Sequence, residues 1–390
     1  MIGVGAGSAV VAGALEQPAL LNLPFNANSL FAAYGAKPNP RHIDQRLVTA
    51  YYEQANLGVE YQLAKGYVVE VNYIGTFGRK LVGLEDVNNY DGRTACTSAT
   101  LSAACLAAGF TAPVSARPNL TFNADNFRTN GFSSNYNGLQ TSVRKSFSNG
   151  LMLLASYTYS KSMDIISDVF TVKGGQTSIS DPLNPSYDYG PADFDVRNHA
   201  SITANYESQW KKQNLLLGGW GISPIVTMSS GSPFSVYSTA GGYNPLKTGV
   251  TGSSANRVPY IGQGSEKNAV HHNVNLALGG YLLASDFDAS TTANPQPYTC
   301  PANVNQGLWC EAPASRNAFY GPSFFNVDLG VFKRFPIWEA QTVTFQASFF
   351  NLLNHTNFGN PVSDLNSGQF GAAIASADPR IVQLSLRYDF

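Results

Sequence analysis

RIVQLSLRYDF, residues 380–390, alternates between apolar and polar side chains from Val382 to its end. A helix would scatter every second residue around its axis, because successive residues turn by about 100°. The stretch is therefore predicted to be a β-strand with one apolar face. The positions on that face are Val382, Leu384, Leu386, Tyr388 and Phe390.

The same alternation appears in AYYEQANLGVEYQLAKGYVVEVNY, residues 50–73. Two alternating runs flank the short AKG segment at 64–66, and only Glu53 interrupts the apolar positions. This pattern predicts a β-hairpin with one apolar face. Its clearest apolar positions are Leu57, Val59, Tyr61, Val69 and Val71.

Three more hairpins follow, with turns at 148–150, 209–213 and 336–340. Asn149-Gly150 in the first of these turns suits the positive φ angles of a tight turn. With the terminal strand, the pattern predicts nine strands of 11 to 14 residues. The apolar face of the last hairpin holds Phe325, Val327, Leu329, Val343 and Phe345.

The predicted connections alternate between short and long. Four long segments, at 80–135, 162–196, 230–322 and 353–379, separate the short turns. Bacterial outer-membrane β-barrels have short periplasmic turns and long extracellular loops. The expected fold is therefore an all-β, antiparallel transmembrane β-barrel, with its apolar parity facing lipid. A soluble β-sandwich gives the same parity, but long strands with aromatic residues near their ends favour the barrel.

The composition agrees with this fold class. Only 13% of the residues are charged, 12% are aromatic, and the formal net charge of −1 gives no reason to expect nucleic-acid binding. No run of about 18 apolar residues predicts a transmembrane helix.

The start of the chain lacks the basic region of a secretory signal, since the first Lys or Arg is Lys37. Either the protein stays in the cytosol or its true N-terminus is missing. A barrel with both ends in the periplasm needs an even number of strands, so residues 2–15 are a candidate tenth strand. We therefore expect a weak strand and an extracellular loop in 1–46, and the barrel segment in 47–390.

The four cysteines form two locally spaced pairs in predicted long loops, without the CxxC spacing of zinc or redox sites. Local disulfides are favoured over unpaired thiols for an exported protein. The cysteines are Cys96, Cys105, Cys300 and Cys310.

No residue constellation predicts catalysis, and no cofactor or metal site is expected. His271-His272 has no carboxylate at ligand spacing, so a solvated loop pair is the favoured interpretation. An acidic loop is also predicted to be solvated rather than to bind calcium or a ligand. It contains Asp181, Asp188, Asp193 and Asp195. Any ligand recognition is expected from the Tyr-, Asn- and Asp-rich long loops and the polar residues of the lumen.

Several segments resemble the C-terminal barrel of TonB-dependent outer-membrane receptors of the Oar-like type. They occur in the same order as in that family and together cover nearly the whole chain from about residue 40. The segments are NLGVEYQLAKGYVVEVNYIGTFGRKL (56–81), ASYTYSKSMD (155–164), FDVRNHASITANY (194–206), MSSGSPFSV (228–236), SFFNLLNHTNFGNP (348–361) and RIVQLSLRYDF (380–390).

The resemblance implies a 22-stranded barrel with an N-terminal plug, often behind a carboxypeptidase-regulatory-like domain. This chain would be a fragment supplying about ten strands, with the plug and TonB box absent. The implied partners are outer-membrane lipid, the barrel-assembly machinery that reads the terminal strand, the TonB energy-coupling complex and an unknown extracellular ligand. The implied function is TonB-dependent uptake across the outer membrane. A small passive pore and a soluble secreted adhesin are the alternatives.

Overall fold

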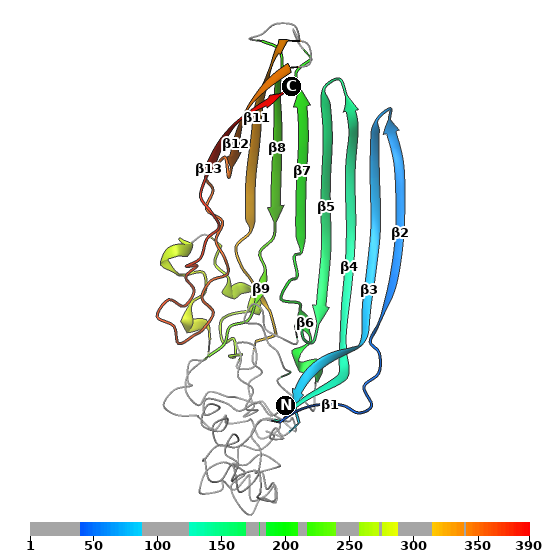
Figure 1. Ribbon diagram of the computed structural model, residues 1–390. Helices are drawn as coiled ribbons and strands as arrows, with labels where there is room; N and C mark the ends of the chain where they lie inside the picture. The colour runs from blue at the N-terminus through cyan, green and yellow to red at the C-terminus, as the bar shows by residue number, and fades with distance from the viewer. Residues whose placement is uncertain are drawn as a thin grey trace, which may run out of the picture.

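The computed structural model describes residues 40–87, 125–168, 179, 185–209, 217–238, 257–272, 275–287, 314–338 and 341–390. Its main feature is a broad, curved antiparallel sheet (Figure 1). Nine long strands follow one another in the order β13-β12-β11-β8-β7-β5-β4-β3-β2. The nine strands predicted from alternation are confirmed. They are β2 (Tyr51–Ala64), β3 (Tyr67–Asp86), β4 (Asn126–Ser148), β5 (Leu151–Asp164), β7 (Asn198–Glu207), β8 (Trp220–Ser229), β11 (Phe324–Trp338), β12 (Gln341–Phe350) and β13 (Ile381–Asp389).

Shorter elements lie at one end of this sheet. β1 (Arg41–Ile43) pairs in parallel with β4, and β6 (Gly190–Pro191) pairs with the end of β5. A separate two-stranded sheet joins β9 (Pro233–Phe234) to β10 (Phe319–Tyr320). Four single-turn 3₁₀ helices complete the described elements, and none of them is long or apolar enough to cross a membrane. They are η1 (Pro185–Asp188), η2 (Glu266–Ala269), η3 (Leu276–Leu278) and η4 (Ala284–Asp286).

The expected strand length of 11 to 14 residues holds for β2 and β5. It was wrong for the other long strands, slightly for β7, β8, β11, β12 and β13 and most for β3 and β4, which have 20 and 23 residues. Their ladder continues through the predicted loop as far as the pair Asp86 and Asn126. Register shifts between Gly78 and Gly83 let the ladder bend, and Gly83 leaves room for the ring of Phe132, which a Cβ atom would meet at 2.2 Å. The alternation weakens here, and for that reason the extension was not predicted.

The predicted tight turn at 148–150 has the expected backbone geometry. Asn149 and Gly150 both have positive φ, at 50° and 78°, between β4 and β5. In contrast, β8 begins at Trp220 after the non-strand residues 217–219, later than the predicted turn at 209–213 implies. The candidate tenth strand at 2–15 lies outside the described residues.

The strand register assembles two continuous rows of opposite character. One row runs across six strands as Val69, Val143, Ala155, Ile202, Val226 and Val327. The adjacent row, one residue along, is Glu70, Ser142, Ser156, Ser201, Thr227 and Asn326. Because successive side chains point to opposite sides of a sheet, the first row lies on an apolar face and the second on a polar face.

The apolar face ends in two buried lysines at the short-turn end of the strands. At the short-turn end, Lys145 is buried and donates to the carbonyls of Ser148 and Leu151 at 3.0 and 2.7 Å. Lys333 is also buried and donates to the carbonyl of Gly218. Both ammonium groups lie over aromatic rings, Lys145 over Tyr67 at 5.7 Å. The lysines therefore satisfy turn carbonyls instead of facing the apolar band.

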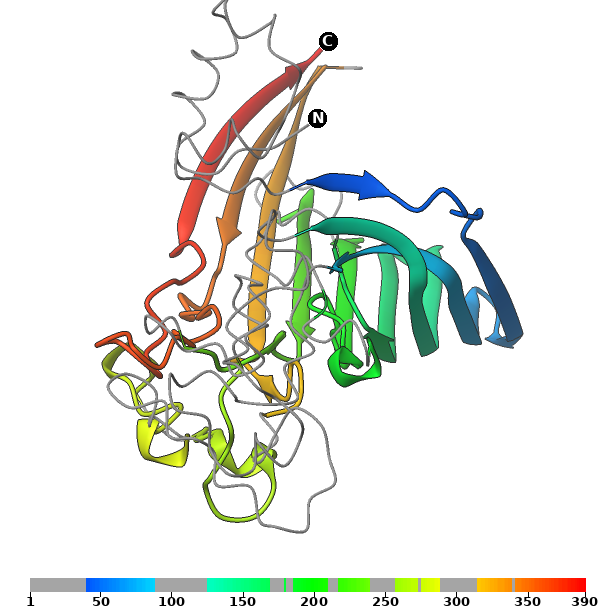
Figure 2. The same cartoon turned by 90° about the horizontal axis from the view of Figure 1, so that it is seen from below.

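The sheet is curved but not closed in the described part of the chain. Figure 2 shows β2 and β13 at the two ends of the curved band, without contact between them. Each pairs on one side only among the described strands, and both are exposed along almost their whole length. The described strands thus form part of a barrel wall with two free edges.

Candidate functional site

The long connections form a lobe at one end of the sheet. We define the loop lobe as the described parts of 230–238, 257–287, 314–323 and 357–377. Figure 1 shows it beyond the ends of β8 and β11. A bridge between Tyr237 and Asp364 joins two of its segments. The lobe is therefore a folded unit built from distant loops.

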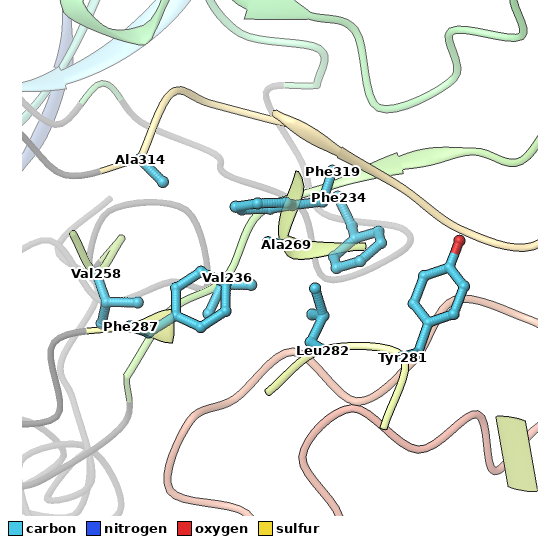
Figure 3. Packing of buried hydrophobic residues seen from close by; sticks show 9 residues of the cluster. All are labelled: Phe234, Val236, Val258, Ala269, Tyr281, Leu282, Phe287, Ala314 and Phe319. Carbon is cyan, nitrogen blue, oxygen red and sulfur yellow. The ribbon is translucent and has the colours of Figure 1, made fainter. Parts of the chain in front are cut away.

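The loop lobe has its own apolar core (Figure 3). At its centre, the ring of Phe287 meets those of Phe319, Phe370 and Tyr260 edge-on, at centroid distances of 5.5, 5.7 and 5.9 Å. Edge-to-face contacts of this kind add to the stabilisation from burial. The buried members are Phe234, Val236, Val258, Ala269, Tyr281, Leu282, Phe287, Ala314 and Phe319.

Arg316 connects the loop lobe to the end of β5. Its guanidinium is fully buried and contacts the carboxylate of Asp164 at 2.6 Å and that of Asp193 at 3.1 Å. It also donates to Ser167 Oγ at 2.7 Å. One side chain thus holds together a strand end, the loop before β7 and the lobe.

A second buried arginine, Arg257, makes an equivalent connection to η1. It contacts Asp188 at 2.7 Å, lies over the ring of Tyr187 at 4.6 Å and donates to the carbonyl of Ala314 at 3.0 Å. Burial works against the charged form, but Asp188 and Tyr187 outweigh it and raise the pKa of Arg257 above its ordinary value. The group therefore remains charged inside the lobe.

The loop before β7 is held by further polar contacts. The amide of Asn317 donates to Asp193 at 2.6 Å and to the carbonyl of Pro191 at 2.8 Å. Tyr320 donates to Asp195 at 3.0 Å and accepts from Arg197 at 3.1 Å. Each buried carboxylate of this loop has a cationic or hydroxyl partner, as buried charge requires.

The predicted solvated state of the acidic loop is therefore wrong. Asp188 and Asp195 are fully buried or nearly so, and Asp193 is half-buried against Arg316. Asp181 lies outside the described residues. The acidic spacing was visible in the sequence, but the arginines that neutralise it come from segments much later in the chain, and no local pattern pairs them.

A cavity of about 600 Å³, lined by both polar and apolar groups, lies between the loop lobe and the sheet. Ser229 and Phe324, paired neighbours on the polar face of β8 and β11, form part of its lining. Hydroxyl, amide and aromatic groups dominate the rest, a combination that suits a ligand with neutral polar groups. The lining includes Asp193, Ser232, Ser235, Tyr237, Asn317, Phe358, Asn360 and Ser363.

The candidate histidines His271 and His272 are not among the described residues that line this cavity. His272 packs edge-on against Tyr281 at 6.1 Å. Within the described ranges no group of three or more His, Cys, Asp or Glu side chains is placed to hold a metal ion. Cys96, Cys105, Cys300 and Cys310 lie outside the described residues.

A sheet with one apolar and one polar face, short turns at one end and a loop lobe at the other defines a membrane β-barrel wall. The family model described as "Outer membrane beta barrel domain" matches residues 6–383, and the chain belongs to this family. It is an outer-membrane protein, and the family is one of membrane barrels, not of enzymes. A search of curated proteins finds no match.

Solved structures with a similar fold include the outer membrane transporter YddB from Escherichia coli, with 11% identity and a TM-score of 0.43 over 89% of this chain and 34% of that one. The pyoverdine receptor FpvA from Pseudomonas aeruginosa PAO1 has 11% identity and a TM-score of 0.42, over 94% and 32% of the two chains. The FrpB iron transporter from Neisseria meningitidis has 9% identity and a TM-score of 0.41, over 89% and 32%. The chain spans about a third of the length of these proteins.

Proposed function

We propose that this chain is part of an outer-membrane receptor that takes up a ligand by TonB-dependent transport, of the Oar-like type. The observation that carries the proposal is the loop lobe, which is fixed to the end of β5 by Arg316 and to η1 by Arg257, and which borders a cavity on the polar side of the sheet. A passive pore needs no such cavity, whereas a receptor needs a shaped surface at its entrance.

In this proposal the long-loop end is extracellular, the short turns and Phe390 are periplasmic, and the polar face lines the lumen. The apolar face contacts lipid over a height that fits a bilayer. Eight residues separate the rows of Leu153 and Lys161 on this face, which is roughly 26 Å along the strand. A strand tilt of about 35–45° turns this length into a height of roughly 20 Å, slightly less than the apolar band of about 25 Å in known barrels. The proposed lipid-facing residues are Leu57, Val59, Tyr61, Val69, Val71, Phe325, Val327, Leu329, Val343 and Phe345.

The free edges of β2 and β13 support a larger barrel. Unpaired backbone groups in a bilayer cost several kcal/mol each, so both edges need partner strands in the membrane. We infer that these strands, a plug and a TonB box belong to a longer receptor, together with an upstream carboxypeptidase-regulatory-like domain.

The test is uptake by the complete receptor in a Gram-negative host with and without functional TonB. Radiolabelled neutral oligosaccharides and ferric hydroxamate chelates are suitable probes, because the cavity combines hydroxyl, amide and aromatic groups and Asp193 is its charged lining residue. Accumulation of a probe only in the TonB-positive host supports the proposal. Equal flux in both hosts, with large conductance in planar bilayers, would establish the passive-pore alternative.

Deletion of Phe390 is expected to reduce the amount of folded receptor in the outer membrane severalfold. Phe390 is 94% exposed and stacks on Tyr388 at 5.8 Å, so it contributes little to packing within the sheet. We propose that it completes the terminal signal read by the assembly machinery, with Val382, Leu384, Leu386 and Tyr388. Quantification of the heat-modifiable form on gels checks this, and unchanged levels would refute the assigned role.

A further inference from the structure

A second, smaller pocket lies on the polar face of the sheet, beside the cavity described above. It has a volume of about 320 Å³ and is lined from β5 by Thr158, Ser160 and Ser162, which share the polar-face parity. Tyr136 of β4, which pairs with Ser162, supplies an aromatic ring. This ring extends over Gly138, where a Cβ atom would meet the tyrosine hydroxyl at 2.6 Å. The pocket therefore opens on the same side of the sheet as the cavity.

One row of the polar face joins the pocket to the cavity. Thr158 pairs with His199, and both line the pocket. His199 pairs in turn with Ser229, and Ser229 pairs with Phe324, which lines the cavity. Neighbouring strands lie about 4.8 Å apart, so the row spans roughly 14 Å from β5 to β11. The two hollows are thus adjacent along one continuous surface that is long enough for an extended ligand.

The loop before β7 borders both hollows and presents an exposed aromatic ring. Asp193 lines the cavity, whereas Phe194 and Asp195 line the pocket. Phe194 is 65% exposed, yet both of its neighbours are fixed. Asp193 is held by Arg316 at 3.1 Å, and Asp195 accepts the backbone N–H of Ser162 at 2.6 Å. A ring so exposed contributes little to packing, but a ring on a fixed loop can bind a ligand at a low cost in conformational entropy.

The rest of this surface offers neutral hydrogen-bonding groups. Several of its hydroxyl groups have no side-chain hydrogen bond within the described ranges, including those of Thr158, Ser162, Ser229, Tyr237 and Ser363. The two carboxylates of the lining already pair with arginines, at 3.1 and 3.5 Å. No lysine or arginine is among the described residues that line either hollow. An ionic ligand would therefore find no free counter-charge here, whereas a neutral ligand rich in hydroxyl groups would find many partners.

We propose that the cavity and the pocket form one extended site for a neutral, linear oligosaccharide. A sugar unit has an apolar face of C–H groups and an edge of hydroxyl groups, so it packs against aromatic rings and exchanges hydrogen bonds with neutral hydroxyls. The row from Thr158 to Phe324 is longer than a single sugar ring, so several linked units are needed to fill both hollows. The inference rests on the proposed receptor function and narrows its ligand, since a compact ferric hydroxamate would occupy the cavity alone.

The test is oligosaccharide binding by the complete receptor, purified in a detergent without a sugar headgroup. An array of neutral and anionic carbohydrates, from monosaccharides to long oligomers, selects the probe. Calorimetry then measures the affinity of the receptor for the selected oligomer, for its shorter members and for its monosaccharide. We expect neutral oligomers to bind, and the affinity to rise with the number of units until both hollows are filled.

Variants on the two sides of the row test whether one ligand occupies both hollows. Phe194→Ala, in the pocket, should weaken binding of the long oligomer roughly tenfold, as the loss of an aromatic hot spot does, and Phe194→Tyr should retain it. Tyr237→Phe, which removes only a hydroxyl from the cavity, should weaken binding roughly fivefold, the effect of one hydrogen bond. The control is Phe147→Ala, whose side chain is 57% exposed at the short-turn end of β4, and it should leave the affinity unchanged.

An affinity loss in only one of the two hollows would overturn the extended site, as would equal affinity for the monosaccharide and its oligomers. Binding of anionic carbohydrates alone, or of nothing on the array, would overturn the neutral oligosaccharide. Heat-modifiability checks that each variant is folded. Binding is measured without TonB, so a receptor that takes up a ferric hydroxamate but binds no oligosaccharide refutes this inference alone. A receptor that binds the oligomer but shows equal uptake with and without TonB refutes only the proposed transport.

Discussion

Replacing Arg316 with methionine is expected to destabilise the attachment of the loop lobe by about 3–5 kcal/mol, the usual cost of removing one partner from a buried ion pair. Asp164 is 4% exposed and would lose its cationic partner, and Asp193 would lose its contact at 3.1 Å. Methionine fills much of the same volume, so the loss comes mainly from charge and hydrogen bonding.

Amide hydrogen exchange of the complete receptor in membranes measures this effect. Segments 257–272 and 314–320 should exchange more than a hundredfold faster than in the unaltered receptor, because local opening becomes easier by the free energy lost. The strands β3 to β5 should keep their protection. Slow exchange of both segments in the variant would show that Arg316 does not hold the lobe.

Arg334→Met is the matched control. Arg334 forms an ion pair with Glu207 at 3.2 Å, but its side chain is 49% exposed and solvent screens the pair. Exposed pairs contribute at most about 1 kcal/mol, so exchange of the loop lobe should be unchanged. Comparison of the two variants distinguishes the effect of removing a buried ion pair from the effect of replacing an exposed arginine.

Replacing Val71 with arginine is expected to destabilise the folded barrel by about 2–4 kcal/mol, the cost of a basic side chain on the lipid face near the bilayer midplane. Val71 lies midway along the apolar part of β3, between Val59 and Thr141 in the register. Its side chain is 39% exposed, so the arginine would project into lipid instead of displacing a packed core.

The control is Asn72→Arg, one residue along on the polar face. Asn72 donates to Glu70 at 2.6 Å, and Glu60 pairs with Glu70 in the register, so an arginine here meets carboxylates. We expect a change below about 1 kcal/mol, typical of a partly exposed ion pair. Urea unfolding of the complete receptor in lipid vesicles, followed by tryptophan fluorescence, compares the two variants. Equal costs at both positions would contradict the assignment of the apolar face to lipid.

Local patterns were sufficient to predict most of the sheet. Alternation identified all nine long strands, and Asn149-Gly150 identified its turn correctly. The prediction failed where local signals were weak: β3 and β4 continue to Asp86 and Asn126 through glycine-rich sequence, and β8 starts at Trp220. Pairing between β3 and β4 stabilises these extensions although their own sequences alternate poorly. The extensions can therefore be recognised only from the register of the two strands.

Few contacts of the candidate site could be predicted from the sequence. The acidic loop was noticed, but its burial was missed because Asp193 and Arg316 are 123 residues apart. The core of the loop lobe likewise combines segments with no shared periodicity. Their residues become neighbours only when the strands bring the loop ends together.

The sequence by itself determined the strands, their two faces and the alternation of short and long connections, because side-chain parity along a strand is a local property of the chain. The tertiary structure alone decided which carboxylates are buried, which lysines remain exposed and where the cavities lie. Burial and charge pairing depend on which distant segments meet, and the cost of burying an unpaired charge then selects the arrangement in which Arg257 and Arg316 reach their partners.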